Sequence, residues 1–295
     1  MKAVNPQKLV SIKNILFPTD FSSAAYLALP FAVAIARSYG AKVHVLHVTT
    51  LDRHLTSPPA SWPGVSVSKS HAEAGTRQLS ERLSGVRHRV VIEEGDVGEI
   101  IPRFIEKNKI DLVVAGTHGR TGLRKAVLGS VAELIFRRSS CPVLIVGPQA
   151  IQNPQALVEM REILYAADWG ENSVATSYAI SLARGLPAHL TLMNVIERAT
   201  IGQGEQARRL VETIRQMLRR LVPSEADPWC APKFVVERGE AAEKILEVAN
   251  KNQADLIVLG LRRTSVPIGI VTNLANSTAY KVASRSTCPV LAVRG

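Results

Sequence analysis

Hydrophobic residues along the chain follow two different spacings. Short runs of apolar, mostly β-branched residues are typical of strands that are buried on both faces of a parallel sheet. Between these runs, apolar residues such as Ile100, Phe104 and Ile105 recur three or four positions apart, which predicts helices that pack on the sheet. Alternation of strand and helix predicts an α/β fold with right-handed crossovers. In the first half, the predicted strands are residues 14–20, 43–48, 90–95, 111–116 and 142–146.

The same order of segments occurs a second time in the chain. Each half closes on a Ser-x-Cys-Pro-Val-Leu segment, at Ser139 and at Ser286. A period of about 145 residues is far too long for a solenoid and indicates a duplicated domain. We therefore expect two tandem Rossmann-like domains, residues 1–150 and 151–295, each a five-stranded parallel sheet flanked by helices. The second set of predicted strands is residues 162–168, 190–195, 234–239, 255–260 and 289–293.

Three other segments complete the predicted organisation. Residues 51–67 contain three prolines and predict a long irregular loop, whereas residues 206–221 predict a basic amphipathic helix. Mixed charges on that helix favour a solvated surface helix over one that binds membranes. The polar, proline-rich residues 147–154 form the predicted connector. The strands at 143–146 and 290–293 are the candidates for pairing the two halves, since edge strands present unpaired backbone groups.

A glycine-rich segment follows the apolar strand at 111–115. It contains Gly116 and Gly119, then Gly129 and Ser130. Glycines at the carboxyl end of a strand allow backbone to approach a ligand closely, and a following helix N-terminus offers N–H groups suited to phosphate. Ser130 and Glu133 fit a capping box, so we expect a helix to begin at Ser130. This arrangement predicts a cradle for nucleotide phosphates.

Asp20 ends the first predicted strand, and Gly116 ends the fourth. Ligands of open α/β sheets bind at the carboxyl ends of strands where the strand order reverses, so these two residues are expected to meet there. Asp20 could instead cap the helix that follows it, a role that aspartate often fills. Alone, Asp20 favours the capping role; together with the glycine segment, it favours contact with a ligand.

The spacing Gly116-x2-Gly119-x9-Gly129-Ser130, together with residues 14–20, resembles the ATP-binding signature of the universal stress protein family. The resemblance implies adenine nucleotide alpha hydrolase-like domains that bind ATP, with Mg²⁺ carried by the nucleotide rather than by a dedicated protein site. It implies that Val48 contacts adenine, that Asp20 lies near the ribose or base, and that the phosphates lie near Ser130. The residues implied to contact the nucleotide are Pro18, Thr19, Asp20, Val48, Ala115, Gly116, His118, Gly119, Arg120, Gly129, Ser130 and Val131.

The second half departs from this signature. Arg263 stands where the first half has Gly119, and Asn276 stands where it has Gly129. A side chain takes up room that the phosphate needs, and a non-glycine residue at positive φ costs about 1–2 kcal/mol. We therefore expect the second half to bind ATP poorly or not at all, although Arg262 and Arg263 could recruit a different anion.

Composition and charge narrow the class of protein. The formal net charge of +11 favours anionic partners, but the chain has no zinc-finger spacing or aromatic interleaving, which disfavours nucleic acid. Three cysteines are too few for a disulfide framework. The longest uncharged run, residues 21–36, is too short to span a membrane, and Lys13 interrupts residues 10–17, so no signal peptide is expected. We expect a cytoplasmic protein.

Three functions fit these observations. The resemblance implies a nucleotide-dependent regulator in stress response, which binds ATP and hydrolyses it slowly or not at all. A dedicated enzyme is disfavoured because the chain has no Walker A motif, kinase signature or convincing nucleophile–base pair. The third possibility is a scaffold whose duplication builds an internal dimer, with an unknown protein partner. A homo-oligomer is also expected.

Overall fold

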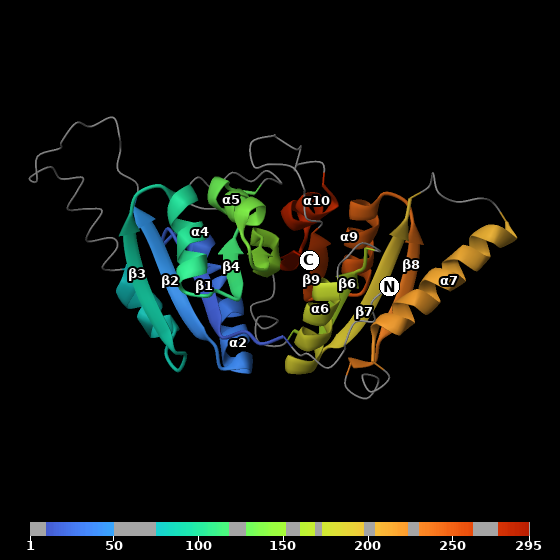
Figure 1. The fold of residues 1–295 in the computed structure, drawn as a ribbon, viewed down its shortest axis with the longest axis horizontal. Helices are drawn as coiled ribbons and strands as arrows, with labels where there is room; N and C mark the ends of the chain where they lie inside the picture. The colour runs from blue at the N-terminus through green and yellow to red at the C-terminus, as the bar shows by residue number, and fades with distance from the viewer. Residues whose placement is uncertain are drawn as a thin grey trace, which may run out of the picture.

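The structure is a computed structural model, and it describes residues 10–49, 75–117, 128–151, 160–168, 173–197, 204–223, 230–261 and 277–294. Two α/β halves lie side by side and share one sheet (Figure 1). The strands of the first half are β1 (Asn14–Pro18), β2 (Lys42–Thr49), β3 (His88–Glu94), β4 (Leu112–Gly116) and β5 (Val143–Val146). Those of the second half are β6 (Glu162–Ala166), β7 (His189–Ile196), β8 (Lys233–Arg238), β9 (Leu256–Leu261) and β10 (Val290–Arg294).

All the predicted strands are present, although β1 and β6 each end two residues earlier than predicted, and the two halves have the same topology. The strand order of the shared sheet is β3-β2-β1-β4-β5-β10-β9-β6-β7-β8. Every neighbouring pair is parallel except β5 and β10, which pair antiparallel with Leu144 opposite Leu291. This contact confirms the expectation that residues 143–146 and 290–293 join the two halves. The result is a single sheet of ten strands within one chain.

Helices cover both faces of this sheet. They are α1 (Ser23–Tyr26), α2 (Leu29–Tyr39), α4 (Val97–Lys107), α5 (Ser130–Arg138), α6 (Ser173–Gly185), α7 (Glu205–Leu221), α9 (Ala241–Lys251) and α10 (Thr278–Arg285), with a short 3₁₀ helix at Pro148–Ile151. The helix predicted at residues 206–221 is confirmed as α7. The irregular loop predicted at 51–67 lies outside the described residues, as does most of the connector, from residue 152 onward. Among the described helices, none is both long and apolar enough to cross a membrane.

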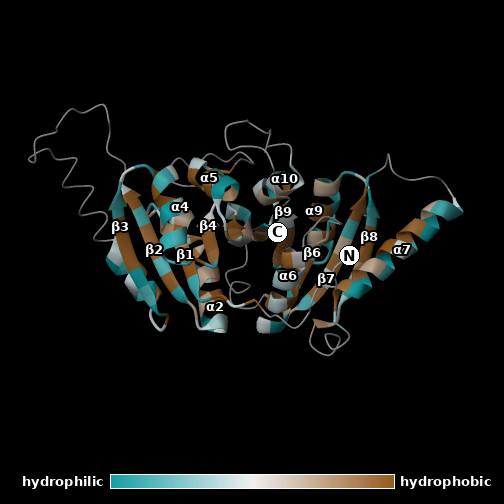
Figure 2. Cartoon of the chain, in the orientation of Figure 1, coloured by the Kyte–Doolittle hydropathy of each residue, from teal (hydrophilic) through white to brown (hydrophobic). Residues whose placement is uncertain are grey.

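The central strands are apolar on both faces, whereas the edge strands β3 and β8 also carry charged residues (Figure 2). The core has two layers, one on each face of the sheet. One layer packs α2 and α6 against residues such as Phe17 and Tyr165. The other packs α4, α5, α9 and α10 against residues such as Leu16 and Ile257. Each layer contains residues of both halves, so the core continues across the β5–β10 junction.

A repeated aspartate fixes the register of the central strands. Oδ2 of Asp111, just before β4, accepts hydrogen bonds from the N–H groups of Lys13 and Asn14 at 2.8 and 2.9 Å. Oδ2 of Asp255, just before β9, accepts from Arg161 and Glu162 at 2.8 and 3.0 Å. Each carboxylate therefore ties the amino end of one strand to that of its neighbour. The two carboxyl ends are aligned at the opposite edge as a result.

Candidate functional site

A cavity of about 240 Å³ lies at the carboxyl ends of β1 and β4, where the strand order of the first half reverses. The chain leaves β1 toward β2 on one side, while β4 lies on the other side. The cavity is therefore where sequence reasoning expects it. Its lining residues are Pro18, Thr19, Asp20, Ala25, Leu46, Val48, Val97, Ile101, Ala115, Gly116, Thr117, Gly129, Ser130, Val131 and Ala132.

Most of the predicted site residues are in this lining. The structure brings together Pro18, Thr19, Asp20, Val48, Ala115, Gly116, Gly129, Ser130 and Val131. The predicted residues His118, Gly119 and Arg120 lie outside the described part of the chain. Residues more than one hundred positions apart in the sequence thus share one cavity. Whether they contact a nucleotide stays a prediction.

The turn after β1 forms one wall and is held by its own hydrogen bonds. Thr19 Oγ1 accepts from the N–H of Phe21 at 2.9 Å, and Asp20 Oδ1 accepts from the N–H of Ser22 at 3.0 Å. Ser22, not Asp20, is the N-cap of α1, with its hydroxyl accepting from Ala25 N at 3.1 Å. The alternative role for Asp20 as a helix cap is therefore wrong. Its carboxylate instead fixes the turn that borders the cavity.

His47 supports the same wall from behind. Its Nδ1 lies 2.8 Å from the carbonyl oxygen of Thr19, and its ring centroid lies 4.5 Å from that of Phe21. Because a carbonyl oxygen only accepts, Nδ1 carries the proton. Asn194 holds the equivalent place in the second half and donates to the carbonyl of Ala167 at 2.8 Å. Both aligned positions carry a side chain that can donate a hydrogen bond, and this pattern in the sequence could have indicated their shared role.

The N-terminus of α5 forms the opposite wall, and its capping differs from the prediction. The helix begins at Ser130 as expected, but the N-cap is Gly129, which has no side chain to cap the helix. Glu133 instead pairs with Arg137 at 3.0 Å, so the proposed capping box is wrong. Gly129 has φ −61° and ψ 158°, a conformation open to any residue, so a side chain at this position would cause no backbone strain. The first-turn residues Ser130, Val131 and Ala132 thus border the cavity directly after a glycine in the sequence.

Gly116 lines the cavity, and the structure also shows a packing reason for a glycine at this position. A Cβ at this position would lie 2.9 Å from the carbonyl oxygen of Ala24 and 3.5 Å from Cα of Ala25. Both atoms belong to α1. Gly116 therefore allows helix α1 to pack closely on β4, a packing requirement that is separate from the approach of a ligand, which stays a prediction.

The lining of the cavity combines apolar and polar groups. Leu46, Val48, Val97 and Ile101 provide branched apolar side chains, and the latter two lie one turn apart on α4. Asp20, Thr19, Thr117 and the first turn of α5 provide polar groups. Sequence reasoning missed Val97 and Ile101, although their spacing of four on a helix that follows β3 was visible. Such a lining can accept a flat apolar group at one end and an anion at the other.

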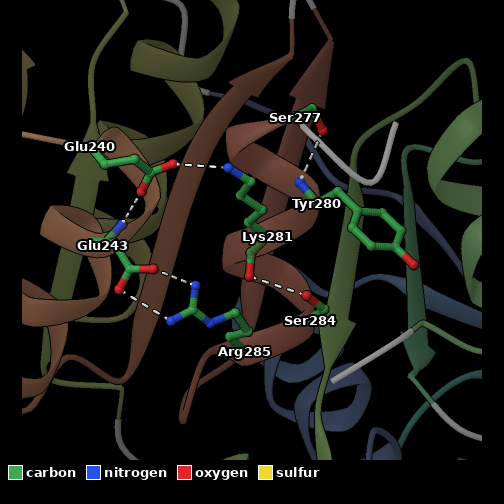
Figure 3. A network of polar contacts seen from close by, with 7 residues as sticks. All are labelled: Glu240, Glu243, Ser277, Tyr280, Lys281, Ser284 and Arg285. Carbon is green, nitrogen blue, oxygen red and sulfur yellow. Dashed lines mark hydrogen bonds and ion pairs between the residues drawn. The ribbon is translucent and has the colours of Figure 1, made fainter. Parts of the chain in front are cut away.

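The equivalent region of the second half is tied together by ion pairs (Figure 3). Glu240, the N-cap of α9, lies 3.1 Å from Lys281 Nζ, and Glu243 lies 2.6 Å from the Arg285 guanidinium, both on α10. Hydrogen bonds from the Glu243 N–H and from Lys281 lower the pKa of Glu240, and the Arg285 guanidinium lowers the pKa of Glu243. Leu134 aligns with Lys281, so the first half has no cation at that position.

Helix α10 is also capped differently from α5. Ser277 is its N-cap, and the Ser277 hydroxyl accepts from the N–H of Tyr280 at 3.2 Å. One of the N–H groups that would face an anion is therefore bonded within the helix itself. The aligned residues Arg262, Arg263 and Asn276 lie outside the described residues.

The fold and the cavity define a duplicated Rossmann-like α/β protein with a ligand crevice at the carboxyl edge of its sheet. The chain belongs to the universal stress protein family, whose model matches residues 11–147 and again residues 160–294. Two universal stress proteins of Methanocaldococcus jannaschii are 34% and 30% identical over 138 and 155 residues. Those matches cover 45% and 46% of this chain and 81% and 96% of the respective relatives.

Solved structures resemble the chain over nearly its whole length. A universal stress protein of Archaeoglobus fulgidus has a TM-score of 0.73 at 20% identity, covering 95% of this chain and 96% of its own. A Pseudomonas aeruginosa protein of unknown function has a TM-score of 0.63 at 20% identity, covering 96% and 93%. These similarities show that the duplicated fold recurs. A shorter universal stress protein, 21% identical over 47% of this chain and with a TM-score of 0.35, was crystallised in complex with cAMP.

Proposed function

We propose that the chain is a nucleotide-dependent regulator in the cytoplasm that binds ATP in the cavity of its first domain. The observation that carries this proposal is the meeting of an apolar slot with the glycine-preceded N-terminus of α5 in one cavity. A base needs apolar walls, and phosphate is stabilised by the N–H groups and the dipole of a helix N-terminus. The cavity therefore offers apolar walls for the adenine base and helix N–H groups for the phosphates.

Each part of the lining has a role in this proposal. Adenine lies between Val48 on β2 and the pair Val97 and Ile101 on α4. The ribose lies near Asp20, whose carboxylate is already fixed by the turn. The phosphates lie against the first turn of α5, at Ser130 and Val131. Val131 is 40% exposed, and a bound nucleotide would cover it.

The positive charge of the chain supports a polyphosphate over a neutral ligand. Mg²⁺ would arrive with the phosphates. Within the described residues, no group of three or more His, Cys, Asp or Glu side chains could hold a metal ion. In this proposal the phosphates hold the Mg²⁺ ion, and the protein binds the Mg²⁺ complex of ATP.

The second domain is proposed to bind no ATP, so occupancy is one nucleotide per chain. The Ser277 cap and the ion pairs from α9 to α10 support this division between the domains. The second domain then serves as a structural partner of the first through β5 and β10. A scaffold in which nucleotide plays no part is the second candidate, favoured by that same pairing.

The test is titration of the full chain with ATP and Mg²⁺ by calorimetry, alongside mass spectrometry of nucleotide released from gently purified protein. One ATP per chain, with weaker binding of GTP and cAMP, is the expected outcome. Two per chain would overturn the proposed division between the domains. Failure to bind any nucleotide would favour the scaffold, and sustained multiple turnover would indicate an ATPase.

A further inference from the structure

The carboxyl end of α5 is held by the other half of the chain. Nη2 of Arg294, at the end of β10, donates to the carbonyl oxygens of Phe136 at 2.6 Å and Arg137 at 2.8 Å. Carbonyls in the last turn of a helix have no partner within the helix, and a cation there is stabilised by the helix dipole. The second domain therefore caps the helix whose first turn borders the cavity.

The antiparallel junction explains how Arg294 reaches this place. Ala292 on β10 lies opposite Val143 on β5, and Val290 lies opposite Ile145. Continuing along β10 therefore leads past the start of β5, toward the turn that connects α5 to β5. Arg294 is the residue at that end of the strand.

The first half does not return this contact. Gly147 aligns with Arg294, and a Cβ on Gly147 would lie 3.7 Å from the carbonyl oxygen of Ser286, the C-cap of α10. The two positions are thus equivalent in space as well as in sequence, but a glycine has no cation to offer. Only the helix that borders the described cavity receives an arginine from the opposite domain at this position.

A second contact from the other half reaches α5 from helix α10. The rings of Phe136 on α5 and Tyr280 on α10 meet edge to face, with centroids 6.5 Å apart and an interplanar angle of 86°. In Figure 1, α5 and α10 lie next to each other above the centre of the shared sheet. Burial lowers the pKa of Arg294, but a guanidinium remains charged throughout the neutral range. The carboxyl end of α5 is therefore fixed by a charged and an apolar contact from the second domain.

We propose that Arg294 is a positioning residue for the nucleotide site, so that the affinity of the first domain depends on a cap supplied by the second. This inference rests on the proposed function. Helix α5 has nine residues, too few to be stable on its own, so its geometry depends on what fixes its ends. Phosphate at the N-terminus and the guanidinium at the C-terminus stabilise the same helix. Each is therefore expected to strengthen the other.

The experiment uses the full chain and compares Arg294→Met with the wild type by ATP titration. We expect affinity to fall about fivefold, at the low end of coupling between two sites. Arg294→Lys, which keeps the charge at the end of the helix, should recover part of the loss. Arg238→Met is the matched control, because it removes an exposed arginine from the end of β8, far along the sheet from α5. The control should bind as the wild type does.

Hydrogen exchange separates a positioning role from a merely structural one. ATP should slow amide exchange at residues 135–139 of the wild type, and this effect should be lost in Arg294→Met. Amide exchange at the equivalent positions at the end of α10 should not change when ATP is added. An Arg294→Met protein with lowered Tm but unchanged ATP affinity would overturn this inference alone, whereas a wild type that binds no ATP would overturn the proposed function with it. If Arg294→Met does not fold, the exchange response of the wild type and the affinity of Arg294→Lys still decide.

Discussion

Ser130 and Ser277 are aligned in the two halves, yet they hold different positions in their helices. Ser277 is the N-cap of α10 and bonds the N–H of Tyr280, whereas Ser130 is the first residue inside α5, after Gly129. The shift decides whether the first turn is capped by its own serine. It separates a helix that presents its N-terminus to a cavity from one that caps itself.

Gly129→Ser should transfer the self-capped state to the first domain. The backbone at Gly129 suits any residue, and serine is among the best N-caps, so the thermal midpoint should stay the same or rise. ATP affinity should fall at least about tenfold, a loss of about 1.4 kcal/mol, because the new hydroxyl would compete with phosphate for the first-turn N–H groups. Calorimetric titration and thermal melts measure the two effects separately.

Gly129→Ala is the control for this variant. It adds a Cβ without an oxygen and so adds bulk without a cap. If alanine and serine weaken ATP equally, steric exclusion rather than capping explains the site. A Gly129→Ser protein that binds ATP normally would contradict the assignment of phosphate to α5.

His47→Leu should weaken the wall of the cavity at Thr19. The carbonyl oxygen of Thr19 would lose its buried donor, which costs about 1–3 kcal/mol of unfolding free energy. ATP affinity should fall along with stability because Thr19 and Asp20 share the turn. Denaturant unfolding and ATP titration are the measurements.

His47→Asn is the matched variant, since Asn194 shows that an asparagine reaches the equivalent carbonyl from the equivalent strand position. It should retain more stability than His47→Leu, losing chiefly the contact with the Phe21 ring. Equal losses in the two variants would mean that the ring, and not the hydrogen bond, holds the turn.

Gly116→Ala should force α1 away from β4. The added Cβ would meet the carbonyl of Ala24 at 2.9 Å, and overpacking of this kind costs about 1–3 kcal/mol. Gly147→Ala is the control, because its Cβ would lie at an ordinary 3.7 Å from the nearest backbone oxygen. Unfolding in denaturant should separate the two variants. Equal stability would show that α1 adjusts without cost.

His44 predicts a dependence of stability on pH. Burial, with smaller effects from Lys42 and Arg89, lowers the pKa of His44 below its ordinary 6.5, and its Nδ1 has no hydrogen-bond partner among the described residues. The unfolded chain then binds a proton that the folded chain resists. The contribution of neutral His44 to the free energy of unfolding should therefore be fully present above pH 6.5 and should decrease as the pH falls below it.

His44→Gln tests the origin of this effect, since glutamine can still donate toward Asn14 Oδ1, the group 3.1 Å from His44 Nε2. The variant should have a flatter decline of unfolding free energy below pH 6.5 than the wild type. An unchanged profile would assign the acid sensitivity to other groups.

The fold could be predicted from the sequence because strands buried on both faces leave uninterrupted apolar runs, and because the duplication presents each run twice. The junction between β5 and β10 was also accessible, since short apolar strands at the end of each half need a partner. The length of β1 could not be predicted from the sequence. It stops at Pro18, where Thr19 and Asp20 turn their side chains onto the backbone of the next residues.

The site was predictable in its location but only partly in its chemistry. Strand ends and glycines indicated the cavity, yet Gly116 is required by Ala24, a contact between segments about ninety residues apart that no local pattern contains. The capping box failed because Ser130 fits the motif in sequence but lies one position too far into the helix. The pairing of Glu240 with Lys281 depends on how α9 lies against α10, which is a matter of tertiary packing.

The β5–β10 contact has a consequence beyond geometry. Two separate copies of a domain joined in this way would come apart on dilution, and every substitution would appear on both sides of their interface. Within one polypeptide the contact is independent of concentration, and its two sides are free to differ. An arginine on one side can therefore face a helix while a glycine stands on the other, and one domain can specialise without its twin having to follow.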